Sequence, residues 1–179
     1  MNDHRALLVI DMQRGFLEEG HPLFCGEAAR RVIPVALQRV EEALKKGMPI
    51  FFTADAHAPD DREFAVFPAH CVRGTAEAQI IPELAGYVDR ATRIDTTSYS
   101  AFFETDLDAR LRGLGVTELV FCGVCTDICV LHTAIDAYYH DYRIDVVSDG
   151  VASLDEKTHE FALRHMETVL GARITRRAR

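Results

Sequence analysis

The feature that most constrains the fold is a regular alternation of short apolar runs with segments of helical spacing. The apolar runs, which are typical of buried strands, occupy residues 6–10, 50–54, 91–95, 119–122 and 143–147. The helical patterns occupy residues 27–46, 106–114, 127–139 and 156–170, and a short last strand is expected at 173–175. This alternation predicts an α/β fold of three layers, α/β/α, with a mostly parallel sheet of about six strands.

Two segments depart from this simple rhythm. Pro34 lies inside the helical pattern of residues 27–46, which Gly47 ends, and a proline in a helix predicts either a kink or a later start. Residues 55–75 form a long loop that contains two prolines and a glycine. A loop of this length in a small domain is usually functional, and parallel sheets place ligands at the carboxyl ends of their strands.

The bulk composition narrows the class of protein. The 179 residues suffice for one domain, expected to span 1–179, and the formal net charge of -8 argues against a nucleic-acid partner. We expect no membrane span and no signal peptide, because no segment is long and apolar enough and the first residues run directly into a strand. Five cysteines are an odd number, and three of them cluster, which favours reduced thiols in a cytoplasmic protein.

Cys129 is the candidate nucleophile. The apolar run 119–122 is followed by Gly123, and Thr126 and Asp127 are residues typical of a helix start. Cys129 therefore falls in the first helical turn after a strand. The partial positive charge of a helix start favours a thiolate, so we expect a reactive sulfur here.

Two more strand ends carry polar residues. Asp11 directly follows the first strand, where it is either a base or ligand or the cap of an Asx turn or helix. Asp55 and His57 follow the second strand, and residues two apart on an extended backbone point the same way. With Glu63 and His70 in the same loop, these oxygen and nitrogen ligands suit zinc, with manganese or iron as alternatives.

Other patterns remain open to two interpretations. Cys122 and Cys125 match a redox Cys-x-x-Cys motif, but Cys122 is expected inside the strand, where it would be small core filler. His132 is three residues after Cys129 and could form a dyad with it or simply lie on the helix surface. The aromatic residues near the strand ends either line a flat pocket or cap the core; they are Phe16, Phe67 and Tyr99.

The chain resembles the isochorismatase-like cysteine hydrolases, and within them the nicotinamidases, over nearly its whole length. Five motifs carry the resemblance, in order and at sensible spacings. They are Leu8-Val9-Ile10-Asp11-Met12-Gln13 with Phe16, Asp55-Ala56-His57, Phe67-Pro68-Ala69-His70, Ser98-Tyr99-Ser100-Ala101-Phe102, and Gly123-Val124-Cys125-Thr126-Asp127-Ile128-Cys129-Val130. The metal-ligand set points to nicotinamidase rather than isochorismatase.

The resemblance implies catalytic roles for matching positions. Cys129 would be the nucleophile, and Asp11 would be the base that takes its proton. The Val124–Cys125 peptide would be a cis bond whose surroundings, with the backbone N–H of Cys129, form an oxyanion hole.

The resemblance also implies a metal and a substrate pocket. Asp55, His57 and His70 would hold one divalent ion, most simply zinc, and Glu63 would match a fourth ligand of some members. That ion would bind the pyridine nitrogen of nicotinamide. The residues that would enclose the ring are Phe16, Phe67 and Tyr99, together with Val124 and Cys125.

One position departs from the family pattern. The third catalytic residue of the family is a lysine, and Thr96 occupies its place in this chain. Threonine cannot supply an ammonium group, and Arg93, three residues away on a strand, is expected to point to the opposite face. The sequence therefore predicts conversion of nicotinamide to nicotinate and ammonia through a thioester, with reduced activity. The alternatives are hydrolysis of another small amide, a binding protein without turnover, and a thiol redox protein; relatives suggest a homo-oligomer.

Overall fold

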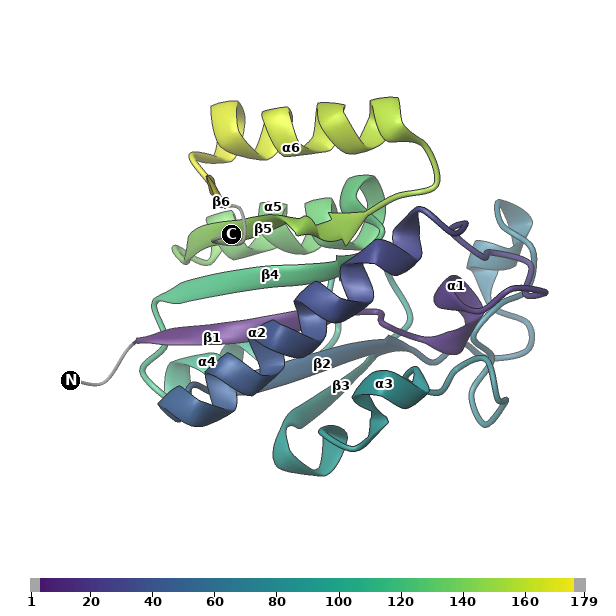
Figure 1. Ribbon diagram of the computed structural model, residues 1–179, viewed down its shortest axis with the longest axis horizontal. Coiled ribbons are helices and arrows are strands. Elements are labelled where there is room, and N and C mark those ends of the chain that lie inside the picture. Colours follow the sequence, from purple (N-terminus) through teal and green to yellow (C-terminus); the bar gives the residue numbers. More distant parts are fainter. Residues whose placement is uncertain (1–3, 176–179) are drawn as a thin grey trace.

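The sheet of the computed structural model consists of strands that are buried on both faces, which explains their nearly unbroken apolar sequences. The structure describes residues 4–175. Its strands are β1 (Arg5–Ile10), β2 (Ile50–Asp55), β3 (Thr92–Thr96), β4 (Glu118–Val124), β5 (Arg143–Ala152) and β6 (Arg173–Thr175). They pair in parallel in the order β3-β2-β1-β4-β5-β6 (Figure 1). The expected sheet is confirmed.

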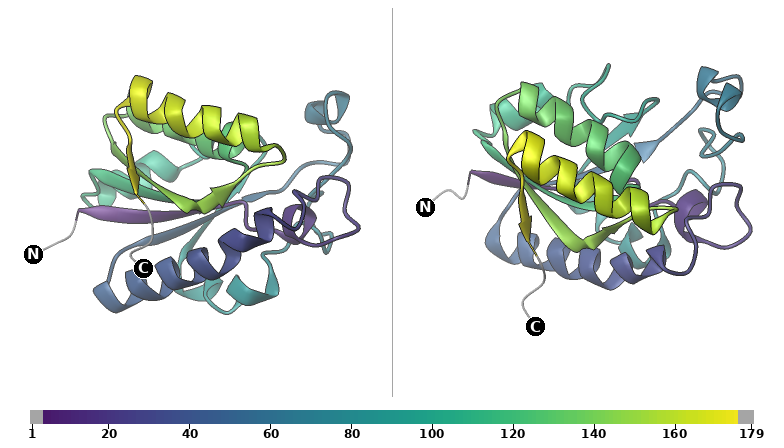
Figure 2. Two further views of the ribbon diagram at one scale, coloured as in Figure 1. Left: turned by 45° about the horizontal axis from the view of Figure 1, so that its top comes forward. Right: turned by 90° about the horizontal axis from the view of Figure 1, so that it is seen from above.

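Helices cover both faces of the sheet. The helices are α1 (Arg14–Leu17), α2 (Val32–Lys46), α3 (Pro82–Ala85), α4 (Leu107–Gly113), α5 (Leu131–Tyr139) and α6 (Glu156–Leu170). Apolar residues of α2 and α3 pack with Leu7 and Val9 of β1 on one face, and those of α4, α5 and α6 pack with Leu8 and Ile10 on the other. Figure 2 shows the two helical layers on either side of the sheet. The three-layer α/β/α prediction is therefore confirmed.

Several element boundaries differ from the prediction. The first long helix begins at Val32, after a 3-10 turn η1 (Ala29–Arg31), rather than at residue 27. Pro34 therefore lies in the first turn, whose N–H groups have no partner within the helix, and the later start was the correct alternative. The expected helix 127–139 is divided into a π-helical turn η4 (Thr126–Val130) followed by α5.

Short elements were also missed. The helices α1 and α3 and the 3-10 turns η2 (Arg62–Ala65) and η3 (Val88–Arg90) lie in segments for which no helix was predicted. They span only three or four residues each, too few for an apolar period to show in the sequence. Strand β5 continues to Ala152, with a register shift against β4 between Phe121 and Gly123.

The strand order fixes where a ligand can bind. From β1 the chain winds outward through β2 to β3, and β4 then returns to pair with β1 on its other side. The direction of winding reverses between β1 and β4, and in open parallel sheets this is the point at which the carboxyl ends of strands leave a crevice. Asp11 follows β1 and Cys129 follows β4, so the two segments meet there.

Gly123 permits the close approach of these two strands. Its φ is +127°, and a Cβ atom added to it would lie 2.0 Å from the backbone oxygen of Ile10. No residue with a side chain fits this position without displacing β1.

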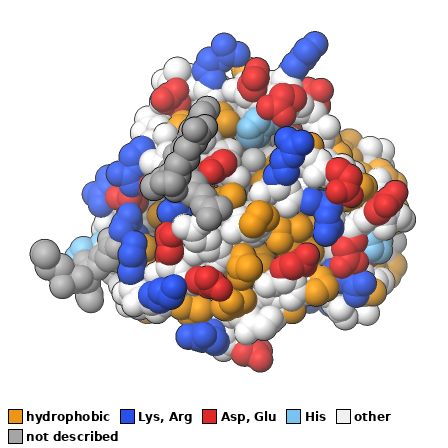
Figure 3. Space-filling model, viewed as in Figure 1, with side chains coloured by type: hydrophobic (Ala, Val, Ile, Leu, Met, Phe, Trp, Pro, Cys, Tyr) orange, Lys and Arg blue, Asp and Glu red, His pale blue; other side chains and the backbone are white. Residues whose placement is uncertain are grey.

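The outer surface is mixed in charge. Figure 3 shows acidic and basic side chains interspersed over the face that carries α2. Within residues 4–175, none of the helices combines the length and apolar character needed to cross a membrane.

Candidate active site

Asp11 and Cys129 meet at the switch point between β1 and β4. The carboxylate of Asp11 and the thiol of Cys129 lie close enough to interact and to shift each other's pKa, although 118 positions separate the residues in the sequence numbering. Both side chains are buried, with 3% and 7% of their residue surfaces exposed. The predicted nucleophile and base are therefore adjacent, as a proton transfer between them requires.

The pKa of the Cys129 thiol differs from the expectation. Burial, followed by the negative charges of Asp11 and Asp55, raises the pKa of Cys129 well above its ordinary value. Burial and the neighbouring charges therefore favour the thiol, whereas the helix start was expected to favour the thiolate. The thiolate instead depends on a base that can take its proton.

Asp11 has the properties of such a base. Burial raises its pKa to about 8, and the nearby charge of Asp55 adds to this effect, while the hydrogen bond from Thr53 and the interaction with Cys129 oppose it. Thr53 Oγ1 donates to Asp11 Oδ1 at 2.6 Å and accepts from the backbone N–H of Asp11 at 3.1 Å. A carboxyl group with a pKa near neutrality can both accept and return a proton. Thr53 was missed from the sequence, although it lies two residues before Asp55 on the same face of β2.

Three candidate metal ligands converge beside this pair. The carboxylate of Asp55 and one ring nitrogen each of His57 and His70 lie within 4.8 Å of one another, and all three residues are buried. Asp55 Oδ2 is 3.6 Å from His57 Nε2 and 3.7 Å from His70 Nε2. Two ligands bound tetrahedrally to zinc at about 2.0–2.1 Å lie about 3.4 Å apart, so these spacings fit one ion.

The surroundings of the two histidines also fit a metal. Both ring nitrogens of His57 are buried, and neither has a hydrogen-bond partner among the described residues. Asp61 Oδ2 lies 3.1 Å from Nδ1 as a charged neighbour. His70 Nδ1 donates to the carbonyl of Pro68 at 2.9 Å, which leaves Nε2 free to bind an ion. Burial lowers the pKa of His57, but Asp55 and Asp61 outweigh it and raise the pKa to about 9. A metal would therefore have to bind here in competition with a proton.

Two further predicted residues lie at the edge of this set. Glu63 Oε1 is 3.6 Å from His70 Nε2 but lies outside the group of three, so its role as a fourth ligand stays a prediction. Thr96 Oγ1 donates to Asp55 Oδ1 at 3.0 Å. The residue in place of the family lysine thus contacts a candidate metal ligand. Arg93 forms an ion pair with Asp95 on the exposed part of β3, as its strand position predicted.

An apolar cavity adjoins both groups of residues. Its wall includes the three predicted aromatic residues, Phe16, Phe67 and Tyr99. The other lining residues are polar or sulfur-containing residues and aliphatic residues, namely Asp55, Glu63, His70, Cys125, Cys129, Leu23, Ile128 and Leu154. The rings of Phe67 and Tyr99 lie nearly perpendicular, 6.4 Å apart. The three rings therefore line a cavity, and their part in binding a substrate stays a prediction.

The remaining predicted residues are placed as follows. The Val124–Cys125 peptide bond is cis. The side chain of Val124 is buried in the core and does not line the cavity, so its part in substrate binding stays a prediction through its backbone alone. His132 is exposed, and its Nδ1 bonds to the carbonyl of Ile128 at 2.8 Å, which favours the helix-surface interpretation over a dyad.

Gln13 was missed as a positioning residue. Its side-chain amide donates to the carbonyl oxygens of Asp55 and Ala78 at 2.8 and 2.9 Å, and it accepts from the N–H of Asp55 at 2.7 Å. These bonds hold the end of β2 against the segment after β1. Its place in the motif of residues 8–13 did not mark it as a clamp, because its burial and these bonds depend on the tertiary structure.

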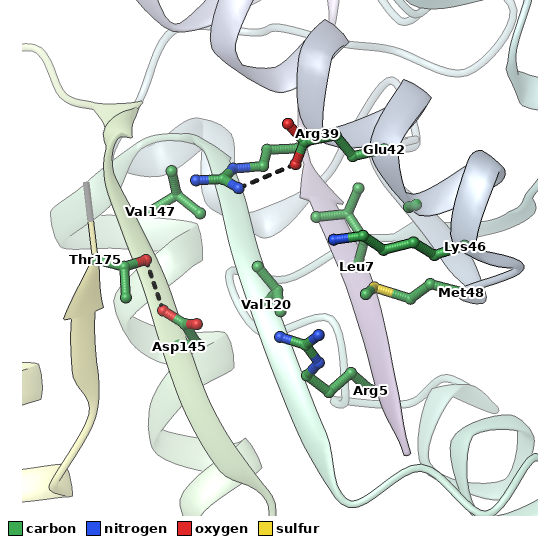
Figure 4. Close-up of a pocket in the computed structure, with 11 residues that line it drawn as sticks. Arg5, Leu7, Arg39, Glu42, Lys46, Met48, Val120, Asp145, Val147 and Thr175 are labelled. Carbon is green, nitrogen blue, oxygen red and sulfur yellow. Dashed lines mark hydrogen bonds and ion pairs between the residues drawn. The ribbon is translucent and has the colours of Figure 1, made fainter. Parts of the chain in front are cut away.

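A second cavity lies away from these strand ends, between α2 and strands β1, β4, β5 and β6 (Figure 4). Three of its charged groups have partners within it: Arg39 pairs with Glu42 at 3.2 Å, and Asp145 accepts from Thr175 at 2.8 Å. The described residues that line it include no cysteine or histidine. The candidate active site is therefore the cavity at the switch point.

Comparison with known proteins agrees with this geometry. A family model described as the isochorismatase domain matches residues 5–178. The chain belongs to the isochorismatase family. The family's fold and its strand-end site account for the arrangement described above, and the chain is an isochorismatase-family hydrolase with nicotinamidases among its relatives.

Three relatives illustrate the range of the family. A pyrazinamidase/nicotinamidase of Streptococcus mutans superposes with a TM-score of 0.91 at 40% identity, covering 96% of this chain and 99% of its own. A pyrazinamidase of Pyrococcus horikoshii in complex with zinc superposes with a TM-score of 0.89 at 32% identity, covering 97% and 99%. An Arabidopsis thaliana protein named a probable inactive nicotinamidase is 30% identical over 92% of this chain and 88% of its own.

Proposed function

We propose that this protein is a metal-dependent cysteine amidohydrolase that converts nicotinamide to nicotinate and ammonia. The observation that carries the proposal is the position of the interacting Asp11 and Cys129 side chains beside a cavity lined by aromatic rings and candidate metal ligands. The names of the structural relatives, nicotinamidase and pyrazinamidase, support the same substrate class.

The substrate is held by the cavity. The ring of a pyridinecarboxamide fits among Phe16, Phe67 and Tyr99, which offer apolar and edge-on aromatic contacts. Asp55, His57 and His70 would hold the divalent ion, which when bound supplies a Lewis acid that anchors the ring nitrogen. This anchor would orient the carboxamide group toward Cys129.

The reaction uses Asp11 twice. Asp11 accepts the proton of Cys129, and the sulfur attacks the carboxamide carbon. Backbone N–H groups around Cys129 stabilise the oxyanion, and Asp11 returns the proton to the departing ammonia. Asp11 then accepts a proton from water, and the resulting hydroxide attacks the thioester carbon. The C–S bond breaks, the proton on Asp11 returns to the sulfur of Cys129, and nicotinic acid leaves and ionises to nicotinate. Because its pKa lies near 8, Asp11 can exchange protons in both directions at neutral pH.

The test is ammonia release from nicotinamide by purified protein supplied with zinc or manganese. We expect turnover in the wild type and none in Cys129→Ala, and we expect denaturing mass spectrometry of a rapidly quenched reaction to detect a nicotinoyl adduct on Cys129. Benzamide, which lacks the ring nitrogen, should be a much poorer substrate than nicotinamide. Absence of turnover with either metal would reject the hydrolase proposal.

A binding protein without turnover is the second candidate function. Thr96 in place of the family lysine favours it, as does the relative named a probable inactive nicotinamidase. Calorimetry that detects nicotinamide binding with no ammonia release would support this candidate. Turnover of pyrazinamide or a carbamoyl compound, but not of nicotinamide, would instead identify a hydrolase of another small amide.

A further inference from the structure

A second pair of cysteines lies at the edge of the candidate active site. The sulfur atoms of Cys25 and Cys125 are 3.3 Å apart, although the residues are 100 positions apart in the sequence. Cys125 immediately follows β4, and Cys25 belongs to the segment between α1 and η1. All five cysteines of the structure are free thiols. The motif Cys122-x-x-Cys125 thus contributes one thiol to a pair, but its close partner comes from a distant segment.

The other cysteines have different surroundings. Cys122 Sγ faces the carbonyl of Leu8 at 3.7 Å inside the core, and Cys71 Sγ faces the carbonyl of Glu77 at 3.7 Å. Cys129 interacts with Asp11. The short sulfur–sulfur contact therefore singles out Cys25 and Cys125.

Both members of the pair are connected to the substrate cavity. Cys125 lines it, four residues before the nucleophile, and Leu23, two residues before Cys25, lines it from the opposite segment. The N–H of Cys25 donates to the carbonyl of Phe16 at 2.9 Å, so its segment is fixed beside one of the ring-binding aromatics. A covalent change at this pair is therefore transmitted to the cavity wall.

We propose that Cys25 and Cys125 are a reversible oxidation site whose disulfide closes the substrate cavity. A disulfide bond is about 2.05 Å long, so forming it draws the two sulfurs together by more than 1 Å from their present separation of 3.3 Å. That movement pulls the segment with Leu23 toward the wall formed by Cys125. This inference rests on the proposed function, because it concerns regulation of the same cavity.

The chemistry balances with hydrogen peroxide as the oxidant. One thiolate attacks a peroxide oxygen, the O–O bond breaks, and the released hydroxide takes up the proton that the thiol had lost, leaving a sulfenic acid and water. The sulfur of the second cysteine then attacks the sulfenic sulfur. The S–S bond forms as the S–O bond breaks, and the hydroxyl group leaves with the second thiol proton as water. Two thiols are oxidised and one peroxide is reduced to two waters.

The first experiment identifies the cross-link without measuring activity. Reduced, full-length protein is treated with hydrogen peroxide, alkylated, digested and analysed by mass spectrometry. We expect a peptide pair that joins Cys25 to Cys125, an intact mass lower by two hydrogen atoms, and complete reversal by dithiothreitol. A link from Cys125 to Cys122 or to Cys129, or no link, would overturn the proposal.

The second experiment measures the effect on the cavity with Cys25→Ser as the matched variant, because Cys25 does not itself line the cavity. A peroxide dose that oxidises the wild type should abolish nicotinamide binding, measured by calorimetry, and dithiothreitol should restore it. The variant should bind nicotinamide before and after the same dose. Equal loss of binding in the variant would refute regulation by this pair.

The outcomes separate this inference from the proposed function. A Cys25–Cys125 cross-link that blocks nicotinamide binding, in a protein that releases no ammonia, rejects the hydrolase and retains the oxidation site. Ammonia release by a protein that forms no such cross-link supports the hydrolase and rejects the oxidation site.

Discussion

The hydroxyl group of Thr53 can be removed with almost no change in shape by the substitution Thr53→Val. In the wild type this hydroxyl donates to Asp11 Oδ1 at 2.6 Å and accepts from the Asp11 N–H at 3.1 Å, and it is buried. The substitution therefore deprives the proposed base of a hydrogen bond to its charged form. It also leaves a buried backbone N–H without its acceptor.

The expected size of the effect follows from these contacts. A hydrogen bond to a charged group contributes about 1.5–3 kcal/mol, and about 1.4 kcal/mol corresponds to one pKa unit. Loss of the Thr53 bond should therefore raise the pKa of Asp11 by about 1–2 units. The ionised base is the active form, so kcat/KM increases with pH through this pKa. In Thr53→Val the same increase should occur about 1–2 pH units higher.

The assay is the pH profile of kcat/KM for nicotinamide in wild type, Thr53→Val and Thr53→Ser. Serine keeps the hydroxyl group and should keep the wild-type profile. Urea denaturation should show Thr53→Val to be less stable by about 1–3 kcal/mol, because of the unpaired N–H. If the valine variant loses stability but its pH profile does not move, Thr53 is only structural and our account of Asp11 is wrong.

Four further predictions concern the site and its support. In metal-free protein, burial raises the folded-state pKa of Asp11 from 3.8 to about 8, so the contribution of Asp11 to stability is fully present below pH 4 and is lost as the pH rises toward 8; Asp11→Asn should remove this part of the pH dependence, be inactive, and melt above the wild type at pH 8. An added Cβ at Gly123 meets the backbone of β1, so Gly123→Ala should lower the free energy of unfolding, measured in urea, by at least about 3 kcal/mol. At Gly113 an added Cβ meets nothing within 4 Å, so the control Gly113→Ala should not destabilise the protein. Thr96→Lys places an ammonium group near Asp55 and should raise kcat/KM for nicotinamide; an unchanged or lower value would show that the missing lysine does not limit this chain. Chelation should abolish ammonia release, and zinc should restore it and raise the melting temperature of the wild type but not of His57→Ala.

Local patterns in the sequence were sufficient for the fold class and for the chemical types at the site. The apolar runs and helical periods predicted the strands and long helices, because burial on both faces of a parallel sheet imposes that pattern directly. Asp11, Asp55 and Cys129 could be selected because each follows a strand, and the carboxyl ends of parallel strands meet at one edge. Thr96 was visible as a departure from the family motif.

The contacts between these residues depended on the tertiary structure. The adjacency of β1 and β4 brings Asp11 to Cys129, and the same sequence distances would fit other strand orders. Thr53, Asp61 and Gln13 gave no distinct signal, because a hydrogen bond across the sheet depends on register rather than on local composition.

The sequence by itself determined which residues stand at the ends of the strands and therefore which chemical groups reach the crevice. Only the tertiary structure decided the pKa of the nucleophile and which thiols lie in contact. Burial beside two carboxylates raises the pKa of Cys129 against the influence of its helix start, and Cys125 finds its partner in Cys25 rather than in Cys122. Solvent exclusion and the pairing of distant segments arise from the packing of the whole chain, so neither can be read from a local stretch of residues.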